Sequence, residues 1–141
     1  MKLIIDASVA LAWLLERQEK KEIDCANHVL AALTNMEAQV PSLWHIEIAN
    51  VLLKSERRGI VTEAQVIDYL NKLSHLPITT DDIAVNSRRE IIIALARQHH
   101  LTAYDATYLE MALRTNAPLA TFDNELAEAM RKAGGSVFGD K

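Results

Sequence analysis

Two aspartates stand directly after short apolar runs that are typical of buried strands. Asp6 follows the run 3–5, and Asp123 comes two residues after the run 117–121. In open α/β sheets, positions at the carboxyl ends of parallel strands face the ligand crevice. Asp123 also precedes a helical pattern, so taken alone it reads as a helix N-cap. As a pair, the two aspartates predict a carboxylate site at the edge of a sheet.

Two further carboxylates lie on helical faces that are otherwise largely apolar. Helical spacing places Glu47 in line with Val51. The same spacing places Asp105 in line with Tyr108 and Leu109. An unpaired charge on such a face costs free energy unless the fold supplies a partner. Asp105 alone is also explained as a first-turn aspartate that the helix dipole favours.

Together the four carboxylates predict a metal site, because strand ends and helix starts of an open parallel sheet can converge at one rim. Two like charges about 5 Å apart repel by roughly 3 kcal/mol at an effective dielectric of 20, so the cluster needs protonation or a cation. Oxygen ligands without Cys or His select a hard ion, Mg²⁺ or Mn²⁺. Such an ion keeps waters and is suited to activating one for attack on a phosphodiester.

The elements that position these residues follow from hydrophobic periodicity. Apolar runs that are too short for helices and lack strict polar alternation are typical of buried parallel strands. We expect strands at 3–5, 38–40 and 117–121, with weaker candidates at 76–78 and 137–138. Helical patterns cover about 8–15, 24–35, 42–59, 62–74, 82–99, 103–115 and 124–133. This alternation predicts one layered α/β domain over residues 1–141, with a mostly parallel sheet.

Composition limits the class of protein. Half of the 141 residues are apolar and 24% are charged, with four Gly and three Pro, as in ordinary globular domains. The lone Cys25 has no partner for a disulfide or a zinc site of thiolates, which indicates a reducing, cytoplasmic setting. Asp6 and Ser8 interrupt the apolar opening stretch, so we expect neither a signal peptide nor a membrane span.

The formal net charge of −4 disfavours a protein that coats the phosphate backbone of DNA. It is compatible with an enzyme that grips nucleic acid locally, through a metal ion and a few arginines. Charged residues on helices are usually solvated surface groups, so each arginine is a weak candidate by itself. The candidate phosphate contacts are Arg57, Arg58, Arg88, Arg89, Arg97 and Arg114.

Four short motifs follow one another along the chain: Ile5-Asp6-Ala7-Ser8, Glu47-Ile48-Ala49-Asn50, Leu101 to Tyr108, and Ala120-Thr121-Phe122-Asp123. In this order and at this chain length they resemble the PIN-domain ribonucleases, most closely the VapC toxins of type II toxin–antitoxin modules. The resemblance covers essentially the whole chain. It implies a three-layer PIN-like fold, in which helices flank a mostly parallel five-stranded sheet with the strand order 3-2-1-4-5.

For function, the resemblance implies endonucleolytic hydrolysis of RNA at a Mg²⁺ or Mn²⁺ site formed by the four carboxylates. We expect Asp6 and Asp105 to bind the metal directly, Asp123 to bind it directly or through water, and Glu47 to position or deprotonate the attacking water. The neutral polar residues expected around the metal or on the substrate are Ser8, Asn50 and Thr121. The implied partners are a small VapB-like antitoxin that covers the site and a second copy of the chain in a homodimer.

Two other functions stay open on the sequence. A metal-dependent phosphatase of similar topology would need a second acid two residues after its nucleophile, where this chain has Ser8. A non-catalytic interaction module would hold a structural ion with the same carboxylates, although one local loop more often supplies such a site. A metal-titrated assay on single-stranded RNA, beside a phosphatase assay, separates the three readings.

Overall fold

A four-stranded parallel sheet forms the centre of the computed structural model, which describes residues 1–140. Its strands are β1 (Lys2–Ile5), β2 (Glu37–Val40), β3 (Ile78–Thr80) and β4 (Leu119–Ala120), in the order β3-β2-β1-β4. In the central strand, Leu3 pairs with Ala38 on one side and Ile4 pairs with Leu119 on the other. Leu3, Ile4 and Ile5 have no exposed surface, as expected for a strand covered on both faces.

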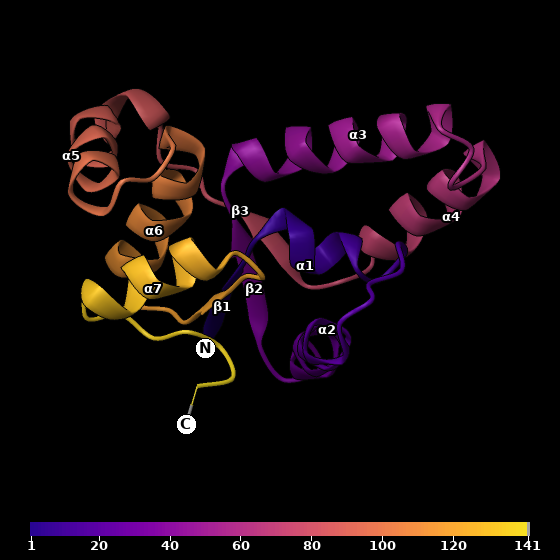
Figure 1. Cartoon of the computed structure of the whole chain (residues 1–141), viewed down its shortest axis with the longest axis horizontal. Helices are drawn as coiled ribbons and strands as arrows, with labels where there is room; N and C mark the ends of the chain where they lie inside the picture. Colours follow the sequence, from indigo (N-terminus) through magenta and orange to yellow (C-terminus); the bar gives the residue numbers. More distant parts are fainter. Residues whose placement is uncertain (141) are drawn as a thin grey trace.

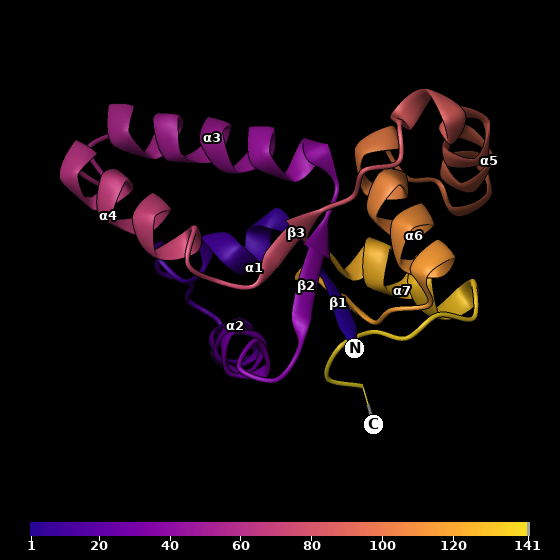
Figure 2. The same cartoon turned by 180° about the vertical axis from the view of Figure 1, so that it is seen from behind.

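Helices cover both faces of this sheet, which gives the three layers seen in Figures 1 and 2. The helices on one side are α1 (Ala7–Leu11), α2 (Lys20–Ala32), α3 (Ser42–Arg57) and α4 (Glu63–Leu73). Those on the other side are α5 (Arg89–His99), α6 (Ala103–Thr115) and α7 (Asn124–Lys132), with a 3-10 turn at Val85–Ser87 before α5. The predicted α/β fold with a helix-flanked parallel sheet is confirmed.

The prediction of a fifth strand was wrong. Val137 forms a single parallel bridge with Leu119, on the edge of β4 that faces away from β1, and no further pairing follows among residues 1–140. Two backbone hydrogen bonds hold this bridge, from the Leu119 amide to the Ser136 carbonyl and from the Phe138 amide to the Leu119 carbonyl, each 2.9 Å. The partner strand β4 has two residues, and the chain then turns at Gly139, whose φ is +94°. Pairing therefore stops after one residue.

Several element boundaries also differ from the sequence expectation. Helix α1 spans Ala7–Leu11 instead of about 8–15, and Asp6 caps it, because its carboxylate accepts the backbone amide of Ser8. The helix α5 begins at Arg89 instead of near residue 82, because the preceding residues form the 3-10 turn. The third strand begins after Pro77, whose carbonyl oxygen accepts the Ala38 amide at 2.9 Å. None of these shifts moves Glu47, Asp105 or Asp123 to a different element, and Asp6 still lies directly after β1.

No helix within residues 1–140 is long and apolar enough to cross a membrane. The apolar residues instead form one core on both faces of the sheet. Trp44, Tyr108, Leu109 and Leu126 are among its largest buried side chains and come from helices in both outer layers.

Candidate active site

Asp6 lies at the carboxyl end of the central strand. Its backbone amide donates to the carbonyl of Ala120 at 2.9 Å, which fixes the end of β1 against β4. One carboxylate oxygen, Oδ1, accepts the Ser8 amide at 3.3 Å, and Oδ2 accepts the hydroxyl group of Thr121 at 2.7 Å. Burial raises the pKa of Asp6, and the nearby charge of Asp123 adds to that rise, while the two hydrogen bonds oppose it.

Thr121 connects Asp6 to Asp123. Its hydroxyl oxygen donates to Asp6 and accepts the backbone amide of Asp123 at 3.0 Å. The Oδ1 atom of Asp123 in turn accepts the amides of Glu125 and Leu126, at 2.9 and 3.2 Å, so Asp123 is the N-cap of α7. The capping role considered for this residue is therefore real, and it leaves the second carboxylate oxygen, Oδ2, without a helix amide.

Glu47 projects from α3 toward Tyr108 of α6. The Tyr108 hydroxyl group donates a 2.5 Å hydrogen bond to Oε1 of Glu47. Burial raises the pKa of the Glu47 carboxyl group and the charge of Asp6 adds to the rise, whereas the bond from Tyr108 lowers it. Sequence reasoning placed Tyr108 on the same helical face as Asp105 but did not assign it to the site.

Asp105 occupies the first turn of α6, where its backbone amide donates to the hydroxyl oxygen of the N-cap residue Thr102 at 3.1 Å. Desolvation by burial raises the pKa of its carboxyl group to about 6. The charges of Asp123, Asp6 and Glu47 contribute to that rise, in decreasing order. Asp105 therefore lies within electrostatic range of all three other carboxylates.

The four carboxylates come from the end of β1, the residues after β4, the first turn of α6 and the middle of α3, and the other three are near enough to Asp105 to act on its charge. Among residues 1–140, no three His, Cys, Asp or Glu side chains lie close enough together to enclose a metal ion as they stand. Mg²⁺ usually binds one or two carboxylates directly and keeps several waters, so a loose set of carboxylates suits it better than a closed cage.

A buried hydroxyl group also fits a bound hydrated ion. The Oγ atom of Ser8 is buried and has no hydrogen-bond partner, although the backbone amide of the same residue bonds Asp6. A buried polar atom without a partner is unusual in folded proteins and calls for water, an ion or a ligand. The donor set is therefore consistent with a hard divalent ion: carboxylate oxygens that repel one another beside an unsatisfied hydroxyl group.

The remaining predicted residues are less closely tied to this cluster. Asn50 is exposed on α3, three residues after Glu47, and its role stays a prediction. Arg88 and Arg114 already form ion pairs within the protein. Both donate hydrogen bonds to the buried Glu110, and Arg114 also donates to Asp81. The candidate arginines that remain exposed are Arg57, Arg58, Arg89 and Arg97.

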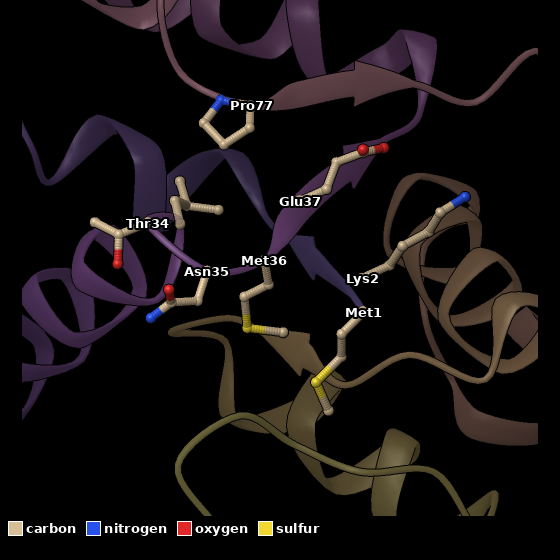
Figure 3. Close-up of a pocket in the computed structure, with 8 residues that line it drawn as sticks. Met1, Lys2, Thr34, Asn35, Met36, Glu37 and Pro77 are labelled. Atoms are coloured by element: carbon tan, nitrogen blue, oxygen red, sulfur yellow. The ribbon is translucent and has the colours of Figure 1, made fainter.

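A hollow of about 620 Å³ on the described surface lies away from the four carboxylates. Lys2, Glu37 and Pro77 line it at the amino ends of the first three strands, together with Met1 and Met36 (Figure 3). Ligand sites of parallel sheets lie at the opposite, carboxyl ends of the strands. The hollow is therefore not the site that the carboxylates form.

Comparison with known proteins shows similarity in sequence and in fold. The family model of the PIN domain matches residues 3–132. Ribonuclease VapC3 of Pyrobaculum aerophilum is 30% identical over 131 residues, which cover 91% of this chain and 94% of that protein.

Two solved structures share the fold. The crystal structure of PAE2754 from Pyrobaculum aerophilum superposes with a TM-score of 0.70 at 22% identity, covering 97% of this chain and 88% of that one. VapBC2 from Rickettsia felis, solved bound to a DNA fragment from its promoter, gives a TM-score of 0.66 at 14% identity, with 97% and 96% covered.

Proposed function

The chain belongs to the PIN-domain family, as a VapC-like ribonuclease, and on that premise we propose that it is a Mg²⁺- or Mn²⁺-dependent endoribonuclease and the toxin of a toxin–antitoxin pair. Four carboxylates from distant segments support the proposal: hydrogen bonds through Thr121 link Asp6 to Asp123, Tyr108 of α6 holds Glu47, and the charges of all three acids act on Asp105. Such a group stores like-charge repulsion, which a divalent cation relieves.

Each carboxylate has a proposed role that its surroundings support. Asp6 and Asp105 would hold the metal directly, and Asp123 would hold it directly or through water with Oδ2, since Oδ1 caps α7. A hard divalent ion supplies a bound water of lowered pKa and neutralises charge on the phosphate. Glu47 would position the attacking water or accept its proton, and the hydrogen bond from Thr121 holds the Asp6 carboxylate in place.

We propose three kinds of substrate contact: a serine hydroxyl group, an asparagine amide and exposed arginines. The buried hydroxyl group of Ser8 has no hydrogen-bond partner, and we propose that it bonds a water molecule next to the carboxylates or between Ser8 and a phosphate oxygen. We assign the same kind of contact to Asn50, which is exposed along α3 from Glu47. The exposed arginines are the remaining candidates for binding the RNA backbone, since phosphate contacts position nucleic acid on a protein.

The partners follow from the family and from the named relatives. The Rickettsia felis neighbour is a VapBC2 complex, and by analogy we propose a VapB-like antitoxin that covers the carboxylates of this chain with a basic side chain. We also propose a homodimer. Ile46 and Leu53 lie seven residues apart on α3, are 69% and 49% exposed, and offer apolar surface to a second protein chain.

A metal-titrated cleavage assay tests the proposed activity. Purified protein is incubated with single-stranded RNA in Mg²⁺, in Mn²⁺, in Ca²⁺ and in excess chelator, with Asp105→Asn as the matched inactive variant. We expect cleavage in Mg²⁺ or Mn²⁺ and none in chelator. Ca²⁺ should support much less, because its larger and irregular coordination disturbs the alignment of water and phosphate.

Four outcomes would contradict the proposal. Cleavage that persists in chelator removes the metal from the mechanism. Equal turnover in Ca²⁺ and Mg²⁺ contradicts a site that needs strict geometry. Hydrolysis of a phosphomonoester without RNA cleavage indicates a phosphatase, and metal binding without either reaction indicates an interaction module.

A further inference from the structure

The side chain of Tyr108 has a buried ring, and its hydroxyl group points at the carboxylate of Glu47. The residue is 1% exposed and packs in the core that lies against the sheet. Its hydroxyl group donates to Oε1 of Glu47 at 2.5 Å, joining α6 to α3 across 61 residues of sequence. A hydrogen bond to an ionised acceptor is shorter and stronger than one between neutral groups, so this contact holds the carboxylate firmly.

The same hydroxyl group lies close to other parts of the carboxylate cluster. Tyr108 stands one helical turn after Asp105 on α6, so both side chains leave the helix on the same side. The backbone amide of Ala7, the residue after Asp6, is near enough to act on the Tyr108 hydroxyl group, and the charge of Asp6 acts on it too. One side chain therefore adjoins the segments that carry three of the four acids.

We infer that Tyr108 is a positioning residue, whose hydroxyl group fixes the Glu47 carboxylate in the orientation that RNA hydrolysis requires; this inference rests on the function proposed above. The bond occupies Oε1 of Glu47 and leaves Oε2 to meet a water molecule. A glutamate side chain has three rotatable bonds, and fixing it in advance removes reorganisation during the reaction.

A second buried tyrosine provides the matched control. Tyr69 on α4 is 6% exposed, and its hydroxyl group donates to the backbone carbonyl of Ala10 at 2.6 Å. Replacing either tyrosine with phenylalanine removes one buried hydroxyl group and one hydrogen bond. Both variants test the loss of a buried tyrosine hydroxyl group, but only Tyr108 contacts the carboxylate cluster, through Glu47.

The experiment compares single-turnover and steady-state RNA cleavage in four proteins and one double variant: wild type, Tyr108→Phe, Tyr69→Phe, Glu47→Gln, and Glu47→Gln with Tyr108→Phe. We expect Tyr108→Phe to lower kcat by about 10- to 100-fold, the usual effect of removing a group that orients a catalytic side chain. KM should stay within about twofold, because the hydroxyl group acts in the transition state rather than in RNA binding. Tyr69→Phe should keep the wild-type kcat.

The double variant tests whether the effect passes through Glu47. Once Glu47→Gln has removed the acceptor charge, adding Tyr108→Phe should change kcat by less than about twofold. A metal-free measurement adds a second readout. The Tyr108 hydroxyl proton should give a low-field NMR resonance that Tyr108→Phe abolishes, Glu47→Gln moves upfield, and Tyr69→Phe leaves in place.

The outcomes separate this inference from the proposed function. If the wild type does not cleave RNA in Mg²⁺ or Mn²⁺, the proposed function falls and the inference falls with it. If the wild type cleaves and Tyr108→Phe matches Tyr69→Phe in kcat, only the inference is overturned. It is also overturned if KM rises while kcat is kept, or if Tyr108→Phe causes the same loss in the Glu47→Gln background.

Discussion

Asp105 carries much of the electrostatic cost of bringing four carboxylates together. Burial, with the charges of Asp123, Asp6 and Glu47, raises its pKa to about 6 in the folded, metal-free protein, from 3.8. Below about pH 4 both the folded and the unfolded chain hold this proton, so the penalty is absent. Between about pH 4 and pH 6 the unfolded chain releases it first, and the free energy of unfolding falls as pH rises.

The size of this penalty follows from the shift. A change from 3.8 to about 6 corresponds to at most about 3 kcal/mol. Asp105 is only half-buried, so solvent screening reduces the penalty to the order of 1 kcal/mol.

Asp105→Asn should remove that penalty without changing the shape of the side chain. In chelator at pH 7 the variant should melt at or above the wild-type temperature, and the advantage should disappear near pH 4. Because the change also removes a proposed ligand, millimolar Mg²⁺ should raise its melting temperature less than that of the wild type. Melting curves at both pH values decide the matter. A variant clearly less stable in chelator, with an undiminished response to Mg²⁺, would mean that Asp105 is an ordinary helix-start residue.

Thr121→Val should reduce activity without unfolding the protein, because Thr121 contacts Asp6 and Asp123 rather than the core. The substitution keeps the shape of Thr121 and removes the hydroxyl group that bonds Asp6 and the amide of Asp123. We expect RNA cleavage, or the affinity for Mg²⁺, to fall by about 10- to 100-fold. The control is Thr115→Val, which removes a hydroxyl bond to the carbonyl of Met111 within α6. Equal activity in the two variants would contradict a role for Thr121 in holding Asp6.

At the scale of single residues, the sequence predicted where a side chain lies in the fold better than which other side chain it contacts. The placement of Asp6 after a strand and of Asp105 near a helix start followed from local pattern, because backbone geometry fixes where such residues lie. The bond from Tyr108 to Glu47 spans 61 residues and depends on two side-chain conformations, so no local pattern contained it. The ion pair between Arg114 and Asp81 could not be predicted for the same reason, since these residues are 33 apart in the sequence.

At the scale of elements, a buried ionic network ties the start of α5 to α6, the helix that carries Asp105. Glu110 of α6 has a side chain that is 4% exposed and accepts from Arg88, just before α5, and from Arg114. Arg114 also pairs with Asp81, which follows β3. Removing one member of a buried network is costly, because it leaves uncompensated charge in a poorly solvated place.

Glu110→Gln changes the shape of the side chain very little, but it should lower the free energy of unfolding substantially. We expect a loss of about 2 kcal/mol, below the roughly 3–5 kcal/mol of fully buried pairs because both arginines keep some contact with water. Urea denaturation measures it. Asp68→Asn, which breaks the exposed pair with Lys72, is the control and should change stability little. Equal effects would show that the Glu110 network contributes no more than a surface pair.

Element boundaries were the least predictable part of the fold, because tertiary contacts decide them. Periodicity predicted one helix from residue 82, but residues 85–87 form a 3-10 turn, and Arg88, at the start of α5, is held by Glu110. The fifth strand was expected from apolar residues at 137–138, and it failed because its partner β4 offers two residues. By contrast, the helix predicted from about residue 62 does begin there, because Thr62 and Gln65 form a capping box that requires only residues three apart.

At the scale of the whole molecule, the central strand was predictable because a run buried on both faces must be apolar throughout. Leu3, Ile4 and Ile5 meet that requirement and have no exposed surface. The order of the strands was not contained in any periodicity and was expected from the resemblance of four motifs to a family. Strand order depends on which crossover each connection makes, and a single sequence does not record it.

The last prediction concerns the effect of the whole chain on a cell. An endoribonuclease without its inhibitor destroys RNA that the host needs, so the proposed toxin should arrest growth when it is expressed without an antitoxin. Asp105→Asn should be tolerated at equal abundance, because it removes a proposed metal ligand while keeping the fold. Tyr69→Phe should still arrest growth, since its hydroxyl group bonds only the backbone of α1. Growth curves, with immunoblots to match the soluble amounts, measure the difference. If cells without a related antitoxin grow normally with abundant soluble wild-type protein, the interaction-module reading is favoured over the toxin.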